Sequence, residues 1–203
     1  MNDIFAAVIH DVKNQLAELS LRLGKRGDAQ KEMEIAISAA RRLSEMLLVH
    51  RQENELLRVN SDSVNAPDFL EMLAAEYREL FPRLLIEIDD KNAPELAFFD
   101  DALVRMALAN AIHNACRIAN ARVQLAAFEQ DKMLVLEVRD DGPGYPDNIL
   151  AGSIDTPLPV SGRGTGLGLY LARKIAELHC LDSRHGYIDL SNEGGAVFRM
   201  MLP

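Results

Sequence analysis

Several features of an ordinary protein are scarce in this sequence. It has no tryptophan, aromatic residues make up 5% of it, and there are two cysteines. Neither Cys116 nor Cys180 belongs to a metal-binding spacing, so we interpret both as reduced thiols. No run of about 18 apolar residues exists, which argues against a membrane-spanning helix. The chain also begins without the pattern of a secretory signal, and together these absences predict a cytoplasmic protein.

Positive charge is also in deficit. The formal net charge is −9 at pH 7. Residues 1–60 hold equal numbers of acidic and basic side chains, so the whole excess of negative charge falls on residues 61–203. Such a surface argues against broad binding to nucleic acid or anionic lipid. Any bound polyphosphate therefore needs local hydrogen-bond donors and a metal ion.

Residues 2–58 have the periodicity of two helices. Apolar residues of the first helix follow an a/d heptad pattern, and a second apolar stripe follows the turn sequence "GKRGD". Two helices of this size leave much of their apolar seam exposed, so we expect a hairpin that forms a four-helix bundle in a homodimer. The seam residues are Phe5, Ile9, Val12, Leu16, Leu19 and Leu23, then Met33, Ala36, Ile37, Ala40, Leu43 and Leu47.

Residues 61–203 mix helical and strand patterns, after a polar linker at residues 59–65. Helices are expected at residues 67–81, 101–119 and 166–178, with Asp100 or Asp101 as the cap of the second. Mixed elements of this kind predict an α+β sandwich with helices on one face of a sheet. The expected strands are residues 84–89, 96–99, two within 123–140, 187–191 and 196–202.

Two glycine-rich motifs lie in this second region. "DDGPGYP" follows a strand that ends at Asp140, and Gly142 and Gly144 allow a tight turn and close approach of a ligand. "SGRGTGLGLYLARKIA" carries four glycines before or at the start of a helix. Each glycine there costs up to about 1 kcal/mol relative to alanine, so the cluster requires a reason. Free backbone N–H groups at a helix start form an anion site, for which phosphate is the usual ligand.

A third pattern lies on the helix "ALANAIHNACRIA". Asn110 and Asn114 are one turn apart on one face, and Arg117 follows three residues later. An amide oxygen suits Mg²⁺, and a guanidinium group suits a phosphate. The pattern is therefore compatible with a metal–phosphate site.

The first helix carries a polar cluster on its outer side. If Ile9 and Leu16 occupy a positions, His10, Asp11 and Asn14 fall at b, c and f, away from the seam. Neutral imidazole is a nucleophile near pH 7. An adjacent carboxylate can hold its other ring nitrogen and accept a proton. The placement predicts that this face is reached by other molecules.

These motifs, in this order, resemble those of two-component sensor histidine kinases. The ATP-binding domain of that family is the GHKL (Bergerat) type, which Hsp90-like and MutL-like ATPases share. "HDVKNQL" looks like the phosphoacceptor H box and "ALANAIHNACRIA" like the N box. "DDGPG" and "GRGTGLGL" look like the two glycine boxes. The resemblance runs from Ile4 to Pro203 and implies residues 1–60 as the dimerisation and phosphotransfer hairpin, and residues 61–203 as the ATP-binding domain.

The resemblance implies roles for single residues around ATP and Mg²⁺. Asn114 would ligate the metal, Arg117 would reach the phosphates, and Asp140 would bind the adenine amino group. The remaining implied nucleotide-binding residues are Asn110, Gly142, Gly144, Arg163, Gly164, Thr165, Gly166 and Gly168. The implied lid, residues 147–162, has no phenylalanine, whereas the family usually carries a phenylalanine-centred box before the lid.

The resemblance also implies the chemistry of the first helix. His10, helped by Asp11, would take the γ-phosphoryl group from ATP and pass it to an aspartate of a response regulator receiver domain. Either Asn14 or Gln15 would orient water for dephosphorylation of that regulator, and we favour Asn14. The signal would come from a separate sensor protein or from a sensor region outside this chain.

Two other classes of function stay open at this point. A phosphotransfer or phosphatase module with a degenerate or regulatory ATP domain is favoured by the unusual lid and the small size. Intact Asp140, Asn114 and the full second glycine motif argue against it. A serine kinase or conformational ATPase would share the ATP domain, but the H box argues against it.

Overall fold

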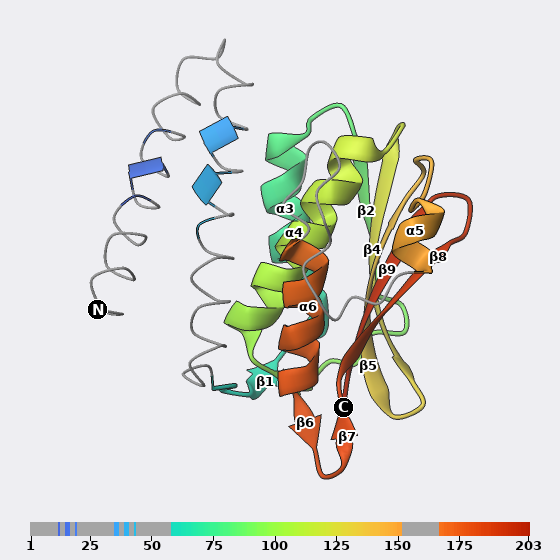
Figure 1. Cartoon of the computed structure of the whole chain (residues 1–203). Helices are drawn as coiled ribbons and strands as arrows, with labels where there is room; N and C mark the ends of the chain where they lie inside the picture. Colours follow the sequence, from blue (N-terminus) through green and yellow to red (C-terminus); the bar gives the residue numbers. More distant parts are fainter. Residues whose placement is uncertain are drawn as a thin grey trace. The chain divides into compact units, whose positions relative to one another are not determined.

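The structure is a computed structural model of the chain. It describes residues 58–151 and 167–203, together with nine single positions nearer the start. The chain divides into two compact units, Met1–Arg58 and Val59–Pro203 (Figure 1). The nine single positions are Val12, Gln15, Leu16, Leu19, Ile35, Ala36, Ala39, Ala40 and Leu43.

The first unit is helical at all nine of these single positions, as the heptad pattern predicts for them. Ala36 is buried, whereas the seam residues Val12 and Leu19 are 38% and 46% exposed. His10, Asp11 and Asn14 lie outside the described residues. The predicted hairpin as a whole, and its pairing with a second copy, therefore stay predictions.

The second unit is an α/β sandwich. Its sheet has the order β2-β4-β5-β9-β8. β2 (Leu85–Asp89) and β4 (Arg122–Gln130) are parallel, and the other neighbours are antiparallel. Three helices pack on one face of this sheet (Figure 1). The remaining strands are β5 (Met133–Asp140), β9 (Ala196–Leu202) and β8 (Tyr187–Asn192), and the helices are α3 (Ala66–Leu80), α4 (Asp101–Ile118) and α6 (Leu167–Leu178).

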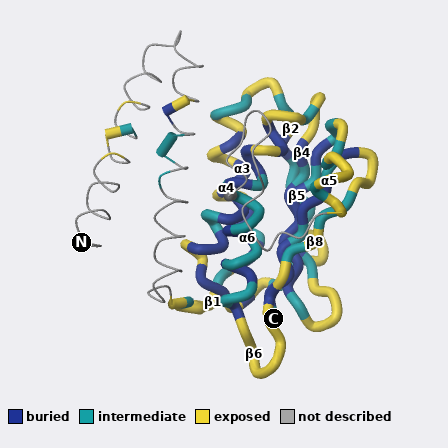
Figure 2. The backbone as a smooth tube through the Cα atoms, in the orientation of Figure 1, coloured by how far each residue is buried: buried dark blue, intermediate teal, exposed yellow. Residues whose placement is uncertain are grey.

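The core lies between the helices and the sheet (Figure 2). Along β5, Leu134, Leu136 and Val138 alternate with residues of the other face, as the period of a strand requires. α4 buries one apolar stripe, including Val104, Leu108 and Ile112, against them. The helix–sheet layering predicted from the sequence is therefore confirmed for the described residues.

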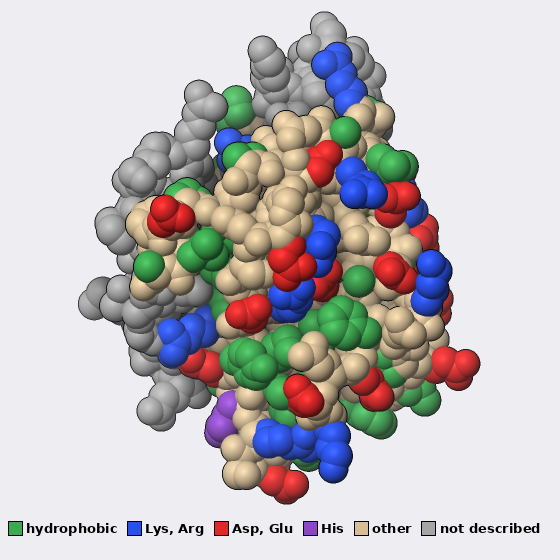
Figure 3. Space-filling view, turned by 90° about the vertical axis from the view of Figure 1, so that its right-hand side faces the viewer, with side chains coloured by type: hydrophobic (Ala, Val, Ile, Leu, Met, Phe, Trp, Pro, Cys, Tyr) green, Lys and Arg blue, Asp and Glu red, His purple; other side chains and the backbone are tan. Residues whose placement is uncertain are grey.

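The opposite face of the sheet carries ion pairs. Glu137 is 8% exposed, and its carboxylate accepts hydrogen bonds from Nε of Arg199 at 2.6 Å and Nε of Arg139 at 3.4 Å. Glu193 accepts from both arginines, at 2.8 and 2.6 Å, which lowers its pKa from 4.5 to about 2. Acidic and basic side chains interleave over this face (Figure 3). The network ties β5 and β9 to the turn between β8 and β9.

The start of α4 is fixed by Asp100, the first of the two caps that the sequence offered. Its Oδ1 accepts a hydrogen bond from Leu103 N at 3.0 Å, which caps the helix. Its Oδ2 accepts from Asn60 N at 2.9 Å, and its own N–H donates to Nε2 of buried His179 at 3.0 Å. Nδ1 of His179 forms a hydrogen bond with the carbonyl oxygen of Ile175 at 2.8 Å, so this ring joins the end of α6 to the start of α4.

The structure corrects the prediction of a polar linker at residues 59–65. Asp62–Val64 form strand β1, antiparallel to β3 (Ala97–Phe99). A three-residue strand of this composition has no detectable alternation, and it is stabilised by its pairing with β3 rather than by its own sequence. The short helix α5 (Asp147–Leu150) was not predicted from the sequence, and neither was the two-stranded pair β6 (Cys180–Leu181) and β7 (Arg184–His185).

In the part of the chain that the structure describes, the longest helix is α4, with 18 residues. None of the helices in this part of the chain combines the length and the apolar character that a bilayer span requires.

Candidate nucleotide-binding site

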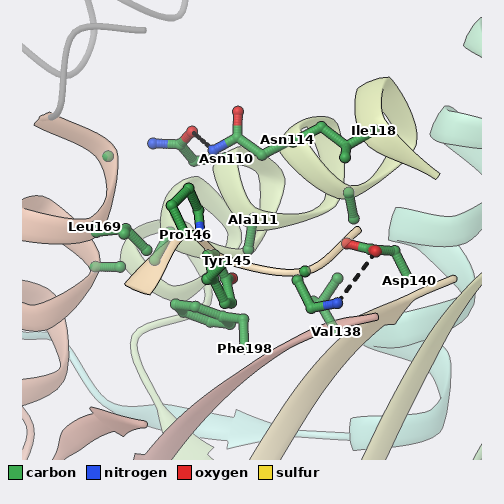
Figure 4. Close-up of a pocket in the computed structure, with 16 residues that line it drawn as sticks. Asn110, Ala111, Asn114, Ile118, Val138, Asp140, Tyr145, Pro146, Leu169 and Phe198 are labelled. Atoms are coloured by element: carbon green, nitrogen blue, oxygen red, sulfur yellow. Dashed lines mark hydrogen bonds between the residues drawn. The ribbon is translucent and has the colours of Figure 1, made fainter. Parts of the chain in front are cut away.

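A pocket of about 100 Å³ lies between α4, the end of β5 and the start of α6 (Figure 4). Its walls are mostly apolar, with three polar side chains, those of Asn110, Asn114 and Asp140. A mainly apolar pocket with a few convergent polar groups is typical of a site for a small molecule. The apolar and glycine lining comes from Ala107, Ala111, Ala115, Ile118, Val138, Gly144, Tyr145, Pro146, Gly168, Leu169, Ala172, Ala196 and Phe198.

Asp140 lies at the end of β5 and is 7% exposed. Its Oδ1 accepts hydrogen bonds from Gly142 N at 2.8 Å and from Ala196 N at 3.2 Å. Within the described part of the chain, Oδ2 accepts no hydrogen bond. A buried carboxylate requires hydrogen-bonding partners, so Oδ2 is suited to accept one from a ligand.

The charge of Asp140 acts on its neighbours. Burial, with a smaller contribution from the Asp140 carboxylate, raises the pKa of the Cys116 thiol to about 12. Burial, followed by the same carboxylate, raises the pKa of the Tyr145 hydroxyl above its usual range. Both groups therefore stay neutral at physiological pH, which leaves Asp140 as the acidic group that lines the pocket.

Asn110 and Asn114 lie side by side on the pocket face of α4 (Figure 4). Nδ2 of Asn114 donates a hydrogen bond to Oδ1 of Asn110 at 3.3 Å. This bond orients the Asn114 amide so that its own oxygen is directed away from Asn110. Asn110 is 9% exposed, whereas Asn114 is exposed to solvent at the mouth of the site.

Gly168, in the first turn of α6, lies against the Asn110 amide. A Cβ atom at this position would be 1.8 Å from Nδ2 of Asn110. Only glycine allows α6 to begin this close to α4. Gly168, the last glycine of the second motif, therefore meets the Asn110–Asn114 pair inside one pocket, although the two are far apart in the sequence.

The donor set fits Mg²⁺ bound together with a phosphate. Among the described residues, no group of three or more His, Cys, Asp or Glu side chains could hold a metal ion alone. The exposed Asn114 amide offers an oxygen atom, the type of ligand that Mg²⁺ prefers. Mg²⁺ is commonly held by few protein ligands, with phosphate oxygens and water completing its shell.

The structure brings together five of the predicted site residues, namely Asn110, Asn114, Asp140, Gly144 and Gly168. Gly142 is adjacent and bonds to Asp140. Arg117 is exposed in the last turn of α4 and is not part of the pocket lining. Gln15 belongs to the other unit, where it is helical and exposed. His10, Asp11, Asn14, Arg163, Gly164, Thr165 and Gly166 lie outside the described residues.

Sequence reasoning missed several apolar residues of the pocket. Tyr145 and Pro146 follow the first glycine motif directly, so their proximity was a usable signal. Ile118 lies one turn after Asn114 on the same helix face. Ala196 and Phe198 come from β9, and no local pattern indicates that this strand borders β5.

Residues 99–203 match the family of histidine kinase-, DNA gyrase B- and HSP90-like ATPases. The match covers more than half of the chain and includes every described pocket residue. The chain belongs to this family, and within it to the two-component sensor histidine kinases with a GHKL-type ATP-binding domain.

Curated relatives agree with this assignment, and a solved structure has a similar fold. The chain is 31% identical to the sensory histidine kinase/phosphatase NtrB of Rhodobacter capsulatus, over 96% of this chain and 59% of NtrB. It is 35% identical to the histidine-protein kinase AfsQ2 of Streptomyces coelicolor, over 53% of this chain and 20% of that protein. Full-length ShkA, solved with AMPPNP, has a similar fold, with a TM-score of 0.67, 19% identity, and coverage of 100% of this chain and 46% of ShkA. The chain thus spans less than two thirds of each of these proteins.

The contact between Gly168 and Asn110 gives a testable prediction. Gly168→Ala places a methyl group on the Asn110 amide and should lower the free energy of unfolding by about 1–3 kcal/mol, the usual cost of overpacking. Urea denaturation measures this change.

A double-mutant cycle with Asn110→Ala supplies the control, since that variant removes the obstructing amide. The cost of Gly168→Ala should be largely lost in the Asn110→Ala background. Equal costs in both backgrounds would show that the helix contact does not depend on this pair.

Proposed function

We propose that the chain is an ATP-dependent protein histidine kinase that autophosphorylates and passes the phosphoryl group to a response regulator. The observation that carries this proposal is the meeting of Asp140, the Asn110–Asn114 pair and Gly168 in one pocket. Asp140 supplies an acceptor for an adenine amino group at one end of the pocket. The Asn110–Asn114 pair and Gly168 supply metal and phosphate ligands at the other end. These groups match the two ends of ATP. The AMPPNP bound to the structurally similar ShkA supports the same ligand class.

Each part of the site has a role in this proposal. Oδ2 of Asp140 accepts a hydrogen bond from the adenine amino group, between the apolar walls formed by Ile118 and Val138. The Asn114 oxygen ligates Mg²⁺, which neutralises charge on the phosphate oxygens. Arg117 and the N–H groups of the second glycine motif, Gly164 to Gly168, approach the phosphates.

His10 is the proposed phosphoacceptor. Its imidazole attacks the γ-phosphorus of ATP, the bond to the bridging oxygen breaks, and ADP leaves. Asp11 accepts the proton that the ring loses. The phosphoryl group then passes to a receiver-domain aspartate. The outward positions of His10 and Asp11 on the heptad pattern support this role.

The same helix face is proposed to act in reverse, as a phosphatase of the regulator. An amide one turn after His10, from Asn14 or Gln15, would position the attacking water. NtrB is named as both a kinase and a phosphatase, which favours this second activity. The exposed, helical position of Gln15 is compatible with it.

The first unit is proposed to dimerise into a four-helix bundle. Val12 and Leu19 belong to the apolar seam and are substantially exposed in the single chain. Pairing with a second copy would remove such residues from water.

Asp140→Asn should weaken ADP binding about tenfold to a hundredfold. Gly142 N and Ala196 N both donate to Oδ1, so an asparagine keeps its oxygen there and turns its Nδ2 donor toward the adenine amino donor. An unpaired buried donor costs about 1–3 kcal/mol. Asn114→Asp should change the Mg²⁺ dependence of binding.

Isothermal titration calorimetry with ADP and Mg²⁺ checks both variants. Asp182→Asn, which lies in the β6–β7 turn away from the pocket, is the matched control and should bind like the parent. Parental affinity in both pocket variants would contradict the assignment of the pocket.

His10→Gln should abolish autophosphorylation from labelled ATP while nucleotide binding survives, because it removes only the nucleophile. Asn14→Ala should still autophosphorylate but lose about 100-fold or more of its phosphatase activity, a typical cost of losing one positioning group. Both activities are measured side by side, with a phosphorylated receiver domain as substrate.

Gln15→Ala is the matched variant. If it alone loses phosphatase activity, Gln15 holds the water. If neither amide variant loses it, this helix face has no hydrolytic role.

Leu16→Asp should dissociate the dimer, because it places a charge in the apolar seam. Light scattering at micromolar concentration should report a dimer for the parent and a monomer for the variant. A monomeric parent would refute the proposed bundle.

A further inference from the structure

The side chain of Asn192, at the end of β8, forms two hydrogen bonds with the backbone of a single pocket residue. Its Oδ1 accepts from Tyr145 N at 2.7 Å, and its Nδ2 donates to the Tyr145 carbonyl oxygen at 2.9 Å. The amide thus satisfies both backbone polar groups of Tyr145, as a neighbouring strand would do. Tyr145 lines the pocket, whereas Asn192 does not.

Gly144 allows the Asn192 side chain to approach the backbone of the turn closely. Its φ is +84°, and a Cβ atom there would be 2.6 Å from Oδ1 of Asn192. Both the left-handed backbone and the close approach therefore require glycine. The last glycine of the first motif serves the contact with Asn192 as well as the turn.

The turn that follows Asn192 is held in place by ion pairs and a backbone hydrogen bond. The next residue, Glu193, is held by Arg139 and Arg199 at 2.6 and 2.8 Å, and Glu193 N donates to Gly195 O at 3.0 Å. The turn after β8 is therefore tied to the sheet on its ion-paired face. A rigid turn presents the Asn192 amide in one orientation, so it can hold Tyr145 in place.

We propose that Asn192 is a positioning residue for nucleotide binding. It fixes the wall that Tyr145 and Pro146 contribute to the pocket, and so keeps the pocket preformed. Preorganisation of this kind increases affinity because the ligand does not have to order the loop. The inference rests on the proposed function for the identity of the ligand, ADP or ATP.

Asn192→Ala should weaken ADP binding about tenfold, which corresponds to about 1.4 kcal/mol, as measured by calorimetry in Mg²⁺. Asn192→Asp keeps the acceptor for Tyr145 N but sets a carboxylate oxygen against the Tyr145 carbonyl, so affinity should fall as well. Asn92→Ala is the matched control, because Asn92 is exposed between β2 and β3, lies outside the pocket lining and forms no side-chain hydrogen bond with another described residue. It should bind ADP like the parent.

Amide hydrogen exchange without nucleotide provides the second readout. Exchange at Tyr145 should accelerate in Asn192→Ala but stay slow in Asn192→Asp, while amides of β4 and β5 keep their protection in both. Parental affinity of Asn192→Ala, or equal loss of protection in β5 and at Tyr145, would overturn the proposal. If the parent itself fails to bind ADP, the proposed function fails, yet exchange at Tyr145 still tests the contact.

Discussion

The hydrogen bonds to the Asp140 carboxylate are the interaction on which the site depends. Oδ1 joins the end of β5 to two separate backbone segments, the glycine turn through Gly142 N and the start of β9 through Ala196 N. Gly195 makes the second contact possible, because a Cβ there would lie 1.9 Å from the Asp140 carbonyl oxygen. One buried carboxylate therefore sets the distance between turn and strand, and both of these segments line the pocket.

α4 must both pack against the sheet and present polar groups to the pocket, and these two requirements usually conflict. Its apolar stripe must pack against the sheet, and its pocket face must present amides. Asn110 is nearly buried, and a buried amide destabilises a fold unless it is hydrogen-bonded. The bond from Asn114 and the close approach of Gly168 surround this amide with defined partners. The polar pair thus contributes to the packing of α6 on α4 as well as to ligand binding.

The larger elements could be predicted because their patterns are local. α4 has a helical period and a capping aspartate, and β4 and β5 alternate around a two-residue turn in which Asp131 and Lys132 both have positive φ. The polar residues of the pocket were predictable for a similar reason, since Asp140 and the Asn110–Asn114 pair belong to short motifs.

Other features depend on contacts between distant segments. β1 becomes a strand only through β3, and Asn192 acts on Tyr145, 47 residues away. Nothing in the sequence "LSNEGG" distinguishes that asparagine from an ordinary turn residue, because its partners are backbone atoms. The pairing of β9 with β5 likewise decides that Ala196 and Phe198 reach the pocket.

The choice of amides on α4 follows from the charge of the ligand that we propose. Two aspartates at positions 110 and 114 would repel each other and the phosphates, in a protein whose net charge is already −9. Asparagine is neutral and both donates and accepts, so Asn114 can give a hydrogen bond to Asn110 and still offer its oxygen to a cation. The amide pair can therefore ligate a metal ion without adding negative charge beside a polyphosphate, which an aspartate pair could not do.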